Sequence, residues 1–395
     1  MQTVVLAAGE GTRMRPLTAR RPKPMLPVAG RPMLEHVLDA AVDAGASSLV
    51  LVVGYHDDAV REHFGDRYRD VPVAYALQES QEGTAHAVRA ARPHLEDAPF
   101  VVIAGDNLYD RETMAVLYAS APALGSFEVP DPRPYGVLDL EGDRVTGVVE
   151  KPSDPPSSRV NASAYAFEAR ALSWLAEVEK SERGEYELTD VLARQIKAGE
   201  VRAVTFERWL DVGRPWELLE ANEWKLGELE RDVGGEVHED AEVVGDVVVE
   251  AGATVRRGVT IEGPALVHSG AEVGPNAYVR GTTAVGEGAK VGHAVEVKNA
   301  VLMENATVGH LSYVGDSVLG RDVNFGAGTT VANLRHDGAD VELTVKGETV
   351  STGRRKFGVV VGDGVKTGID TSLNAGVKLS ADVRTGPGEV VTGDR

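Results

Sequence analysis

The C-terminal fold is decided by Val273-Gly-Pro-Asn-Ala-Tyr-Val279-Arg-Gly-Thr-Thr-Ala-Val285-Gly-Glu-Gly-Ala-Lys-Val291-Gly-His-Ala-Val-Glu-Val297. Valine recurs at every sixth position of this stretch, and an aliphatic residue keeps the same period from Val237 onward. A six-residue repeat is the sequence sign of a parallel β-helix. Each unit is one short strand plus a turn, and three units complete a triangular coil. A sandwich would instead show a period of two.

This period slips by one residue at Leu302 and resumes at Val308. It is lost between Ala332 and Phe357, a segment rich in Arg, His, Asp and Lys that is expected to be a loop extruded from the β-helix. Insertions on a solenoid often carry its binding function. Leucines at helical spacing predict a connecting helix over Trp216–Glu230. The expected domains are residues 1–225, a linker at 226–235, and a β-helix at 236–395.

The first domain alternates strand-like and helix-like segments. This alternation predicts an α/β fold with a Rossmann-like, mixed but mostly parallel sheet, in which ligands bind at the carboxyl ends of the strands. The expected strands are Val4–Leu6, Leu49–Val53, Val73–Ala76, Phe100–Ile103, Gly136–Leu140 and Val145–Val149. The expected helices are Pro32–Ala44, Asp57–Phe64, Gly83–Ala91 and Asp110–Tyr118.

Composition excludes several classes of protein. The 395 residues contain no cysteine, so disulfides, thiolate metal sites and cysteine nucleophiles are ruled out. The net charge of −20 argues against nucleic acid or an anionic membrane as a partner. The start of the chain lacks a leader-like pattern, and no apolar run has the length that spans a bilayer. We therefore expect a soluble, cytoplasmic protein.

A glycine-rich turn follows the first strand-like segment. Its sequence is Ala7-Ala-Gly9-Glu-Gly11-Thr12-Arg13, and Lys23 lies a short distance beyond it. Glycines let backbone N–H groups approach a phosphate closely. Arg13 and Lys23 add two positive charges at the same place. The combination suits a reaction at a nucleotide phosphate.

Polar side chains also follow other expected strands. Asp106 comes after Phe100–Ile103, and Asp211 follows the apolar run Val204–Phe206. Such carboxylates suit Mg²⁺, which takes one or two protein carboxylates plus phosphate oxygens. Asp106 could alternatively cap a helix, since Asp is a common N-cap, and Asp211 could be a structural turn residue. Further polar or glycine positions of this kind are Gln78, Gly83, Thr84, Gly136, Glu150, Lys151 and Asn161.

Together these motifs resemble the signature of the sugar-1-phosphate nucleotidyltransferases. The resemblance implies that Arg13 and Lys23 are catalytic at the nucleotide phosphates and that Asp106 and Asp211 hold Mg²⁺. Gln78 and Gly83 would recognise a pyrimidine base, with the choice between UTP and dTTP left open. The implied nucleotide-binding residues are Leu6, Ala8, Gly9, Gly11, Thr12, Gln78, Gly83 and Thr84. The implied sugar-phosphate-binding residues are Asp106, Gly136, Glu150, Lys151 and Asn161.

A histidine stands out in the repeat region, because a β-helix needs none. His310 follows the inward Val308, and Tyr313 lies close by in the sequence. Other polar residues, Arg280, Lys298, Asn324 and Asn333, are spaced so that stacked coils could bring them together. Histidine is suited to proton transfer near neutral pH. His310 could also be a structural residue at a corner.

With this region included, nearly the whole chain is similar to the archaeal form of the bifunctional N-acetylglucosamine-1-phosphate uridylyltransferase/glucosamine-1-phosphate acetyltransferases. The resemblance implies that His310 is the general base for the sugar amine, which attacks the thioester of acetyl-CoA. It also implies a left-handed β-helix and a homotrimer. The acetyltransferase substrate-binding residues that it implies are Arg280, Lys298, Tyr313, Asn324, Ala327 and Asn333.

One position departs from that family. Its members tend to carry lysines shortly after the residue equivalent to Asn333, whereas this chain has only Arg335 there. The phosphates of the acyl donor could instead meet Lys346 or the basic run at residues 354–356, which is Arg354, Arg355 and Lys356.

Three functions are therefore compared. The first is a bifunctional enzyme that uses small-molecule substrates, namely an NTP, a sugar 1-phosphate and acetyl-CoA. The second is a monofunctional thymidylyl- or uridylyltransferase with a structural or regulatory β-helix. The third is a non-catalytic relative. Arg13, Lys23, Asp106 and Asp211 argue against the third, and the group around His310 favours the first.

Overall fold

The computed structural model describes all residues, 1–395, and the chain forms two compact units. The first comprises Met1–Glu10, Pro22–Met25 and Pro32–Asp211, and the second comprises Gly11–Arg21, Leu26–Arg31 and Val212–Arg395. The domain limits inferred from composition, 1–225 and 236–395, stay a prediction. None of the helices combines the length and apolarity needed to cross a membrane.

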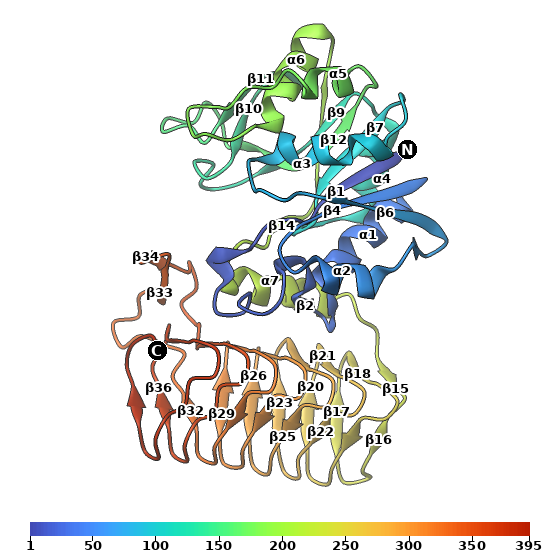
Figure 1. The fold of residues 1–395 in the computed structure, drawn as a ribbon. Helices are drawn as coiled ribbons and strands as arrows, with labels where there is room; N and C mark the ends of the chain where they lie inside the picture. The colour runs from blue at the N-terminus through green and yellow to red at the C-terminus, as the bar shows by residue number, and fades with distance from the viewer. The chain divides into compact units, whose positions relative to one another are not determined.

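The first unit is built on one ten-stranded sheet, in the order β10-β11-β13-β9-β12-β7-β1-β4-β6-β5 (Figure 1). Its strands are β1 (Gln2–Leu6), β4 (Ser48–Val53), β5 (Arg67–Tyr68), β6 (Val71–Leu77), β7 (Phe100–Ala104), β9 (Ala123–Glu128), β10 (Gly136–Glu141), β11 (Arg144–Glu150), β12 (Arg159–Phe167) and β13 (Arg202–Thr205). A separate antiparallel pair is formed by β8 (Asn107–Tyr109) and β14 (Trp209–Asp211).

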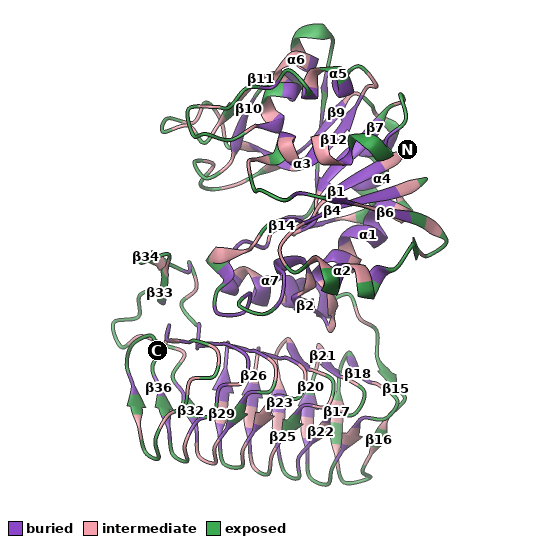
Figure 2. Cartoon of the chain, viewed as in Figure 1, coloured by how far each residue is buried: buried purple, intermediate pink, exposed green.

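Helices cover both faces of this sheet, because successive residues of its strands point to opposite sides. Val5 of β1 packs in one core with Leu34 and Met114, while Val4 packs in another with Val88 and Val191. Figure 2 shows the strands buried between these layers. The helices are η2 (Lys23–Met25), α1 (Met33–Asp43), α2 (Asp57–Phe64), α3 (Thr84–Ala91), η3 (Arg92–His94), α4 (Arg111–Ala119), α5 (Ala171–Leu175) and α6 (Leu188–Ala198).

The sheet is mixed, as expected, but it is not mostly parallel. Parallel pairing joins β7, β1, β4 and β6, and also β9 and β13, whereas β12 runs antiparallel to both β7 and β9. The sequence pattern did not reveal β12. Its central residues, Asn161-Ala-Ser-Ala164, are small or polar and have low strand propensity, so burial between two neighbours decides this strand.

The second unit contains three parallel sheets, which the chain visits in rotation. The first has β15 (Asp232–Val233), β18 (Val247–Val249), β21 (Ala265–Val267), β24 (Thr283–Val285), β27 (Val301–Leu302), β30 (Val318–Leu319), β35 (Val360–Val361) and β37 (Lys378–Leu379). The second has β16 (Glu236–Val237), β19 (Thr254–Val255), β22 (Glu272–Val273), β25 (Lys290–Val291), β28 (Thr307–Val308) and β31 (Asn324–Phe325). The third has β17 (Glu242–Val244), β20 (Thr260–Glu262), β23 (Tyr278–Arg280), β26 (Glu296–Lys298), β29 (Tyr313–Gly315), β32 (Thr330–Val331), β36 (Ser372–Leu373) and β38 (Val390–Val391).

We call residues 232–331 and 358–391, which contain these three sheets, the coil stack. Val267 pairs with Val285, eighteen residues on, and Val285 pairs with Leu302, seventeen residues on. The slip at Leu302 therefore shortens one circuit by a residue and leaves the stacking intact. The repeated aliphatic residues form one buried core inside the stack. This arrangement fits the β-helix that the six-residue period predicts.

The segment without the repeat leaves the stack after β32. It contains an antiparallel hairpin, β33 (Glu342–Val345) with β34 (Glu348–Ser351), which projects from the stack in Figure 1. The expected loop therefore has secondary structure of its own, supported by the buried residues Val341, Leu343 and Phe357. The remaining elements are η1 (Thr12–Met14), β2 (Pro27–Val28), β3 (Arg31–Pro32) and the connecting helix α7 (Pro215–Leu226).

We predict that Phe325→Ala destabilises the coil stack by about 3–5 kcal/mol, because it leaves a cavity where a fully buried ring was. Thermal and denaturant unfolding of the whole chain measures this effect. The matched control is Val390→Ala, at a side chain that is 65% exposed, which should change stability by no more than about 0.5 kcal/mol. Equal effects of the two variants would contradict the assignment of Phe325 to the core.

Candidate active sites

The first candidate site lies at one edge of the large sheet. Strands β1, β6 and β7 run in the same direction, because β1 is parallel to β7 and β4, and β4 is parallel to β6, so their carboxyl ends meet at the same edge. Gly9, Gln78 and Asp106 follow these three ends. A Cβ added at Gly9 would meet nothing within 4 Å, so the space beside this turn is open. The edge therefore offers room for a ligand beside the motifs that the sequence singled out.

Lys23 and Asp106 form a short ion pair at this edge. Lys23 Nζ donates to Asp106 Oδ2 at 2.6 Å, and the lysine side chain is only 6% exposed against 33% for the carboxylate. Burial fixes the ammonium in place, while the carboxylate remains accessible. The sequence allowed Asp106 to be the N-cap residue of a helix. In the structure the N-cap of α4 is Asp110, whose side chain accepts from Thr113 N.

Asp211 is brought beside Asp106 by the β8–β14 pair, in which Asp211 lies opposite Asn107. The buried Asn107 amide lies between the two carboxylates. With its oxygen accepting from Trp209 Nε1, its nitrogen is 3.2 Å from both Asp106 Oδ1 and Asp211 Oδ1. Two partly exposed carboxylates held close together are a donor set that fits Mg²⁺, whose other ligands would be phosphate oxygens and water.

Gln78 and Gly83 are also brought together. The buried Gln78 amide nitrogen lies 3.2 Å from the Gly83 carbonyl oxygen and 3.2 Å from His86 Nδ1. Gly83 has φ +112°, and a Cβ there would lie 2.5 Å from the Tyr186 carbonyl oxygen, so only glycine fits. Thr84 begins α3 and accepts from Leu188 N at 2.9 Å, which ties it to the start of α6.

Gly136, Glu150 and Asn161 form a third group. Gly136 lies opposite Glu150 in the β10–β11 hairpin, and a Cβ on Gly136 would be 3.0 Å from Glu150 Oε2 and 3.6 Å from the Asn161 Cβ. Burial raises the pKa of the Glu150 carboxyl, with Lys151 and Arg183 opposing that effect. Lys151 itself is half exposed, and its Nζ lies 3.7 Å from Glu150 Oε1.

Asn161 is held rigidly in a bulge of β12. Its Nδ2 donates to Tyr165 Oη at 2.7 Å, and its Oδ1 accepts from Ser163 N at 2.9 Å. Ser163 O in turn accepts from Tyr109, two residues beyond Asn107. This chain of bonds connects the expected sugar-binding group to the element that carries the carboxylates.

Three of the expected nucleotide-site residues, Gly11, Thr12 and Arg13, belong to the second unit. Gly11 has φ +66° and precedes the short helix η1. The Arg13 guanidinium lies beside Gly213, whose added Cβ would be 3.0 Å from it. Gly213 N donates to Glu217 of α7 at 2.7 Å. Arg13 is thus held next to the turn between Asp211 and α7.

The second candidate site is on the coil stack, where His310 occupies a corner between β28 and β29 and is exposed. Leu311 N donates to His293 O at 3.0 Å, and Gly328 N donates to His310 O at 2.9 Å. His293, His310 and Ala327 therefore occupy the same corner in successive coils. The Ala327 N–H makes no hydrogen bond within the chain, which leaves it available as a donor. Asn324, on β31, is exposed on the adjoining sheet.

Arg280, Lys298, Tyr313 and Asn333 gather on the third sheet of the stack. Arg280 and Lys298 occupy the same register position on adjacent strands, whose spacing is about 4.8 Å. Asn333 Nδ2 donates to Tyr313 Oη at 3.2 Å, and burial raises the pKa of the Tyr313 hydroxyl. Arg280 is bound to Glu296, at 2.7 Å for its closer contact. Strand β29 connects this group to the His310 corner.

The single basic residue close after Asn333 is already paired. Arg335 donates to Asp337 at 2.7 Å and to Glu342 at 2.9 Å, and these pairs raise its pKa. It lines a pocket of about 560 Å³ between the β33–β34 hairpin segment and the last coils. Arg354 is bound to Glu223 of α7, whereas Lys346 lies exposed at the tip of the hairpin.

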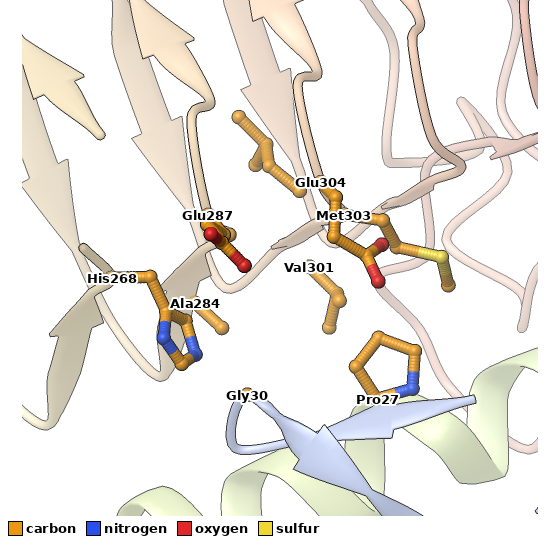
Figure 3. A pocket seen from close by; sticks show the side chains of 10 residues that line it. Pro27, Gly30, His268, Ala284, Glu287, Val301, Met303 and Glu304 are labelled. Carbon is orange, nitrogen blue, oxygen red and sulfur yellow. The ribbon is translucent and has the colours of Figure 1, made fainter. Parts of the chain in front are cut away.

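A smaller pocket, of about 90 Å³, lies where Pro27 and Gly30 face the coil stack (Figure 3). His268 lies against Gly30, its Nδ1 is 2.9 Å from Glu250 Oε2, and its buried Nε2 has no partner. Glu304 in the same pocket is bound by Arg21 at 2.8 Å. The volume is well below the 300 Å³ or more that ligand pockets usually have, and none of the residues predicted for a site lines it.

Several residues at these sites were not identified from the sequence. The sequence gives only a weak indication of these residues, because each one contacts a partner that is distant in the chain. Asn107 lies between the two carboxylates, Gln81 donates to the Ala8 carbonyl at 3.1 Å, Arg183 lies 3.5 Å from Glu150, and Asp316 accepts from Lys298 at 3.1 Å.

Comparison with known proteins places these features in a family. The family described as "Nucleotidyl transferase" matches residues 2–227, and the "GMPPB C-terminal domain" matches residues 261–381. The solved structure of UDP-glucose pyrophosphorylase complexed with UDP-glucose is 25% identical, with a TM-score of 0.53, and covers 57% of this chain and 98% of that one.

Several curated relatives match the entire chain, of which two serve as examples. "Bifunctional protein GlmU" of Methanococcus maripaludis is 42% identical over 399 residues, which are 100% of this chain and 95% of the relative. The "Bifunctional sugar-1-phosphate nucleotidylyltransferase/acetyltransferase" of Sulfurisphaera tokodaii is 36% identical, over 100% of this chain and 98% of the relative. Since the similarity runs through both the sheet edge and the coil stack, the chain belongs to the family of bifunctional sugar-1-phosphate nucleotidylyltransferase/acetyltransferases.

Proposed function

We propose that this protein acetylates glucosamine 1-phosphate with acetyl-CoA and then transfers UMP from UTP to the product, releasing pyrophosphate and UDP-N-acetylglucosamine. The observation that carries the proposal is the match along the whole chain to relatives named as bifunctional, one of which is named for both activities. A monofunctional uridylyl- or thymidylyltransferase would need only the part that the nucleotidyl transferase family matches, residues 2–227.

In the nucleotidyl step, a phosphate oxygen of the sugar 1-phosphate attacks the α-phosphorus of UTP. A P–O bond forms, and the bond to the pyrophosphate leaving group breaks. We assign charge stabilisation to Arg13 and Lys23. The open turn at Gly9 would receive the phosphates, together with backbone N–H groups. Positioning and charge neutralisation supply most of the rate in reactions of this class.

Asp106 and Asp211 would hold Mg²⁺, which when bound neutralises phosphate charge and orients the reacting oxygens. Asn107 keeps the two carboxylates together. Lys23 offsets the negative charge of Asp106, which reduces the repulsion between this carboxylate and an anionic substrate.

The remaining residues of the edge would recognise the base and the sugar. Gln78 and Gly83 would suit a pyrimidine edge, because an amide side chain and glycine backbone lie together there. Gly136, Glu150 and Asn161 would hold the sugar ring, and Lys151 its phosphate. The likeness to a structure complexed with UDP-glucose supports a uridine nucleotide and a hexose.

In the acetyl step, the amine nitrogen of glucosamine 1-phosphate attacks the thioester carbonyl carbon. A C–N bond forms, the C–S bond breaks, and the amine proton passes to His310 and then to the departing thiolate. The Ala327 N–H, one coil away from His310, would stabilise the carbonyl oxygen. Arg280 and Lys298 would bind the sugar phosphate, and Tyr313, Asn324 and Asn333 would orient the sugar.

We also propose that the coil stack is a left-handed β-helix and that three copies assemble around it. Exposed apolar side chains support an interface: Leu311 is 67% exposed and Ile369 is 55% exposed, both at the corner that carries His310. Light scattering on the purified protein tests the assembly, and a monomer at micromolar concentration would refute it.

A mixed assay tests the proposed function directly. The protein is incubated with glucosamine 1-phosphate, acetyl-CoA, Mg²⁺, and UTP or dTTP in parallel, and the products are separated by mass. We expect N-acetylglucosamine 1-phosphate and then its UDP derivative. Nucleotide sugar without any loss of the free amine would favour the monofunctional alternative.

We predict that Asp106→Asn lowers Mg²⁺-dependent pyrophosphate release by about 100-fold or more, because a metal ligand and the partner of Lys23 are lost together. Acetyl transfer should be unchanged. Asp58→Asn, at an exposed carboxylate on α2, is the matched control and should keep both activities. If Asp106→Asn kept wild-type release at every Mg²⁺ concentration, the metal assignment would be wrong.

We predict that His310→Ala abolishes acetyl transfer, since the amine loses its proton acceptor, and leaves nucleotidyl transfer within about twofold of wild type. Loss of free amine and release of pyrophosphate are measured on the same preparation. Arg13→Ala is the reciprocal control and should lose only nucleotidyl transfer. Wild-type acetylation by His310→Ala would refute its role as the base.

A further inference from the structure

A buried carboxylate lies behind the polar group on the third sheet of the coil stack. Asp316 follows β29, and its side chain is 4% exposed. Lys298 Nζ lies 3.1 Å from Oδ2 and 3.4 Å from Oδ1, Asn299 Nδ2 donates to Oδ1 at 3.0 Å, and Asn333 Nδ2 donates to Oδ2 at 2.5 Å. Both oxygens are therefore satisfied by three side chains from two other coils.

This arrangement determines which way the Asn333 amide faces. A carboxylate only accepts hydrogen bonds, so the Asn333 nitrogen must point toward Asp316. Its second N–H is used by Tyr313 Oη at 3.2 Å. No residue of the chain donates to Asn333 Oδ1, so this oxygen is the free end of the side chain. Asp316 thus makes Asn333 an acceptor toward a ligand.

Asp316 also fixes Lys298. The lysine side chain is 17% exposed, so most of it is buried beside the carboxylate. A buried ammonium without a partner would be strongly disfavoured, and the pair holds it at one point on the sheet. Lys298 lies in register with Arg280 on the neighbouring strand, where a phosphate could meet both cations.

The backbone packs closely around the same contacts. A Cβ on Gly315 would lie 2.5 Å from Tyr313 Oη and 2.7 Å from Asn333 Nδ2, so glycine is needed for this group to form. Asn299 also donates to Glu223 of α7 at 2.9 Å, and Glu223 binds Arg354 from the segment that carries the hairpin. Asp316 is therefore the centre of a hydrogen-bond network that α7 and the hairpin segment stabilise.

We propose that Asp316 is a positioning residue for acetyl transfer. It holds Lys298 for the phosphate of the amino-sugar substrate, and it turns Asn333 so that Oδ1 accepts an N–H or O–H of the same substrate. The inference rests on the proposed acetyltransferase function. It concerns the binding of the sugar phosphate and not that of the acyl donor, which gives it a distinct kinetic signature.

Asp316→Asn is the test variant. Asp316 has φ +48°, a left-handed conformation that Asn tolerates well, so the substitution adds no backbone strain. The new NH₂ group would face Lys298 or the Asn333 amide and displace one of them. We expect kcat/KM for glucosamine 1-phosphate to fall about 10- to 100-fold, as a small misplacement of binding groups can cause. The KM for acetyl-CoA and the rate of nucleotidyl transfer should remain at wild-type values, while the unfolding temperature should fall, because the buried Lys298 ammonium loses its charged partner.

Asp322→Asn is the matched control, because Asp322 also occupies a left-handed corner, at φ +55°, but is exposed. It should leave every parameter unchanged. The same substitution is then made in a protein that already carries Asn333→Ala and Lys298→Met. There, Asp316→Asn should lower kcat/KM for glucosamine 1-phosphate by only about threefold or less, because the two side chains that Asp316 positions are absent. If Asp316→Asn does not fold, Asn299→Ala, which removes one donor to Asp316, should raise the KM for glucosamine 1-phosphate in the same selective way.

The outcomes separate the two proposals. Wild-type protein without acetyl-CoA-dependent loss of amine would refute the acetyltransferase function itself. With an active wild type, an unchanged kcat/KM in Asp316→Asn, an equal rise in KM for both acetyl-transfer substrates, or full additivity with the double background would each overturn the positioning role.

Discussion

The backbone ladder between successive coils is the constraint on which the second unit depends. Each strand of the coil stack has only two or three residues, and N–H groups of one coil donate to the next. That coil lies seventeen or eighteen residues further on, or forty-one where the hairpin segment intervenes, as from Val318 N to Val359 O. A residue therefore has a fixed neighbour above and below it, whatever its side chain. Arg280 and Lys298 become adjacent in this way, and so do the His293 and His310 corners. The inward valines make this ladder stable by filling the interior.

The first unit brings residues that are distant in the sequence together in a different way. Parallel strands β1, β6 and β7 bring their carboxyl ends to one edge, where Gly9, Gln78 and Asp106 follow. The other half of the site depends on antiparallel pairing: β14 places Asp211 opposite Asn107, and the bulge in β12 presents Asn161. Parallel order alone would leave the second carboxylate out of reach of the first.

Local pairing explains how a chain with a net charge of −20 could serve anionic substrates. The cations at both sites are held by carboxylates: Lys23 by Asp106, Lys298 by Asp316 and Arg280 by Glu296. Such pairs fix the position of each cation before a ligand arrives, and reduce the reorganisation needed on binding. A phosphate would therefore interact with the positioned cations at these sites more strongly than with the electrostatic field of the net charge.

Much of this protein could be predicted from its sequence. The six-residue period implied stacked parallel strands, because an aliphatic residue at every turn can only be buried inside a coil. Gly9, Asp106 and His310 could be proposed as site residues from the sequence, since each belongs to a local pattern of a few residues. The orientation of Asn333, the place of Asp316 and the amide between Asp106 and Asp211 were not found. Each of these depends on hydrogen bonds between side chains that lie seventeen to about a hundred residues apart. A local pattern determines which face a residue occupies, but only the tertiary structure decides which distant side chain it meets there.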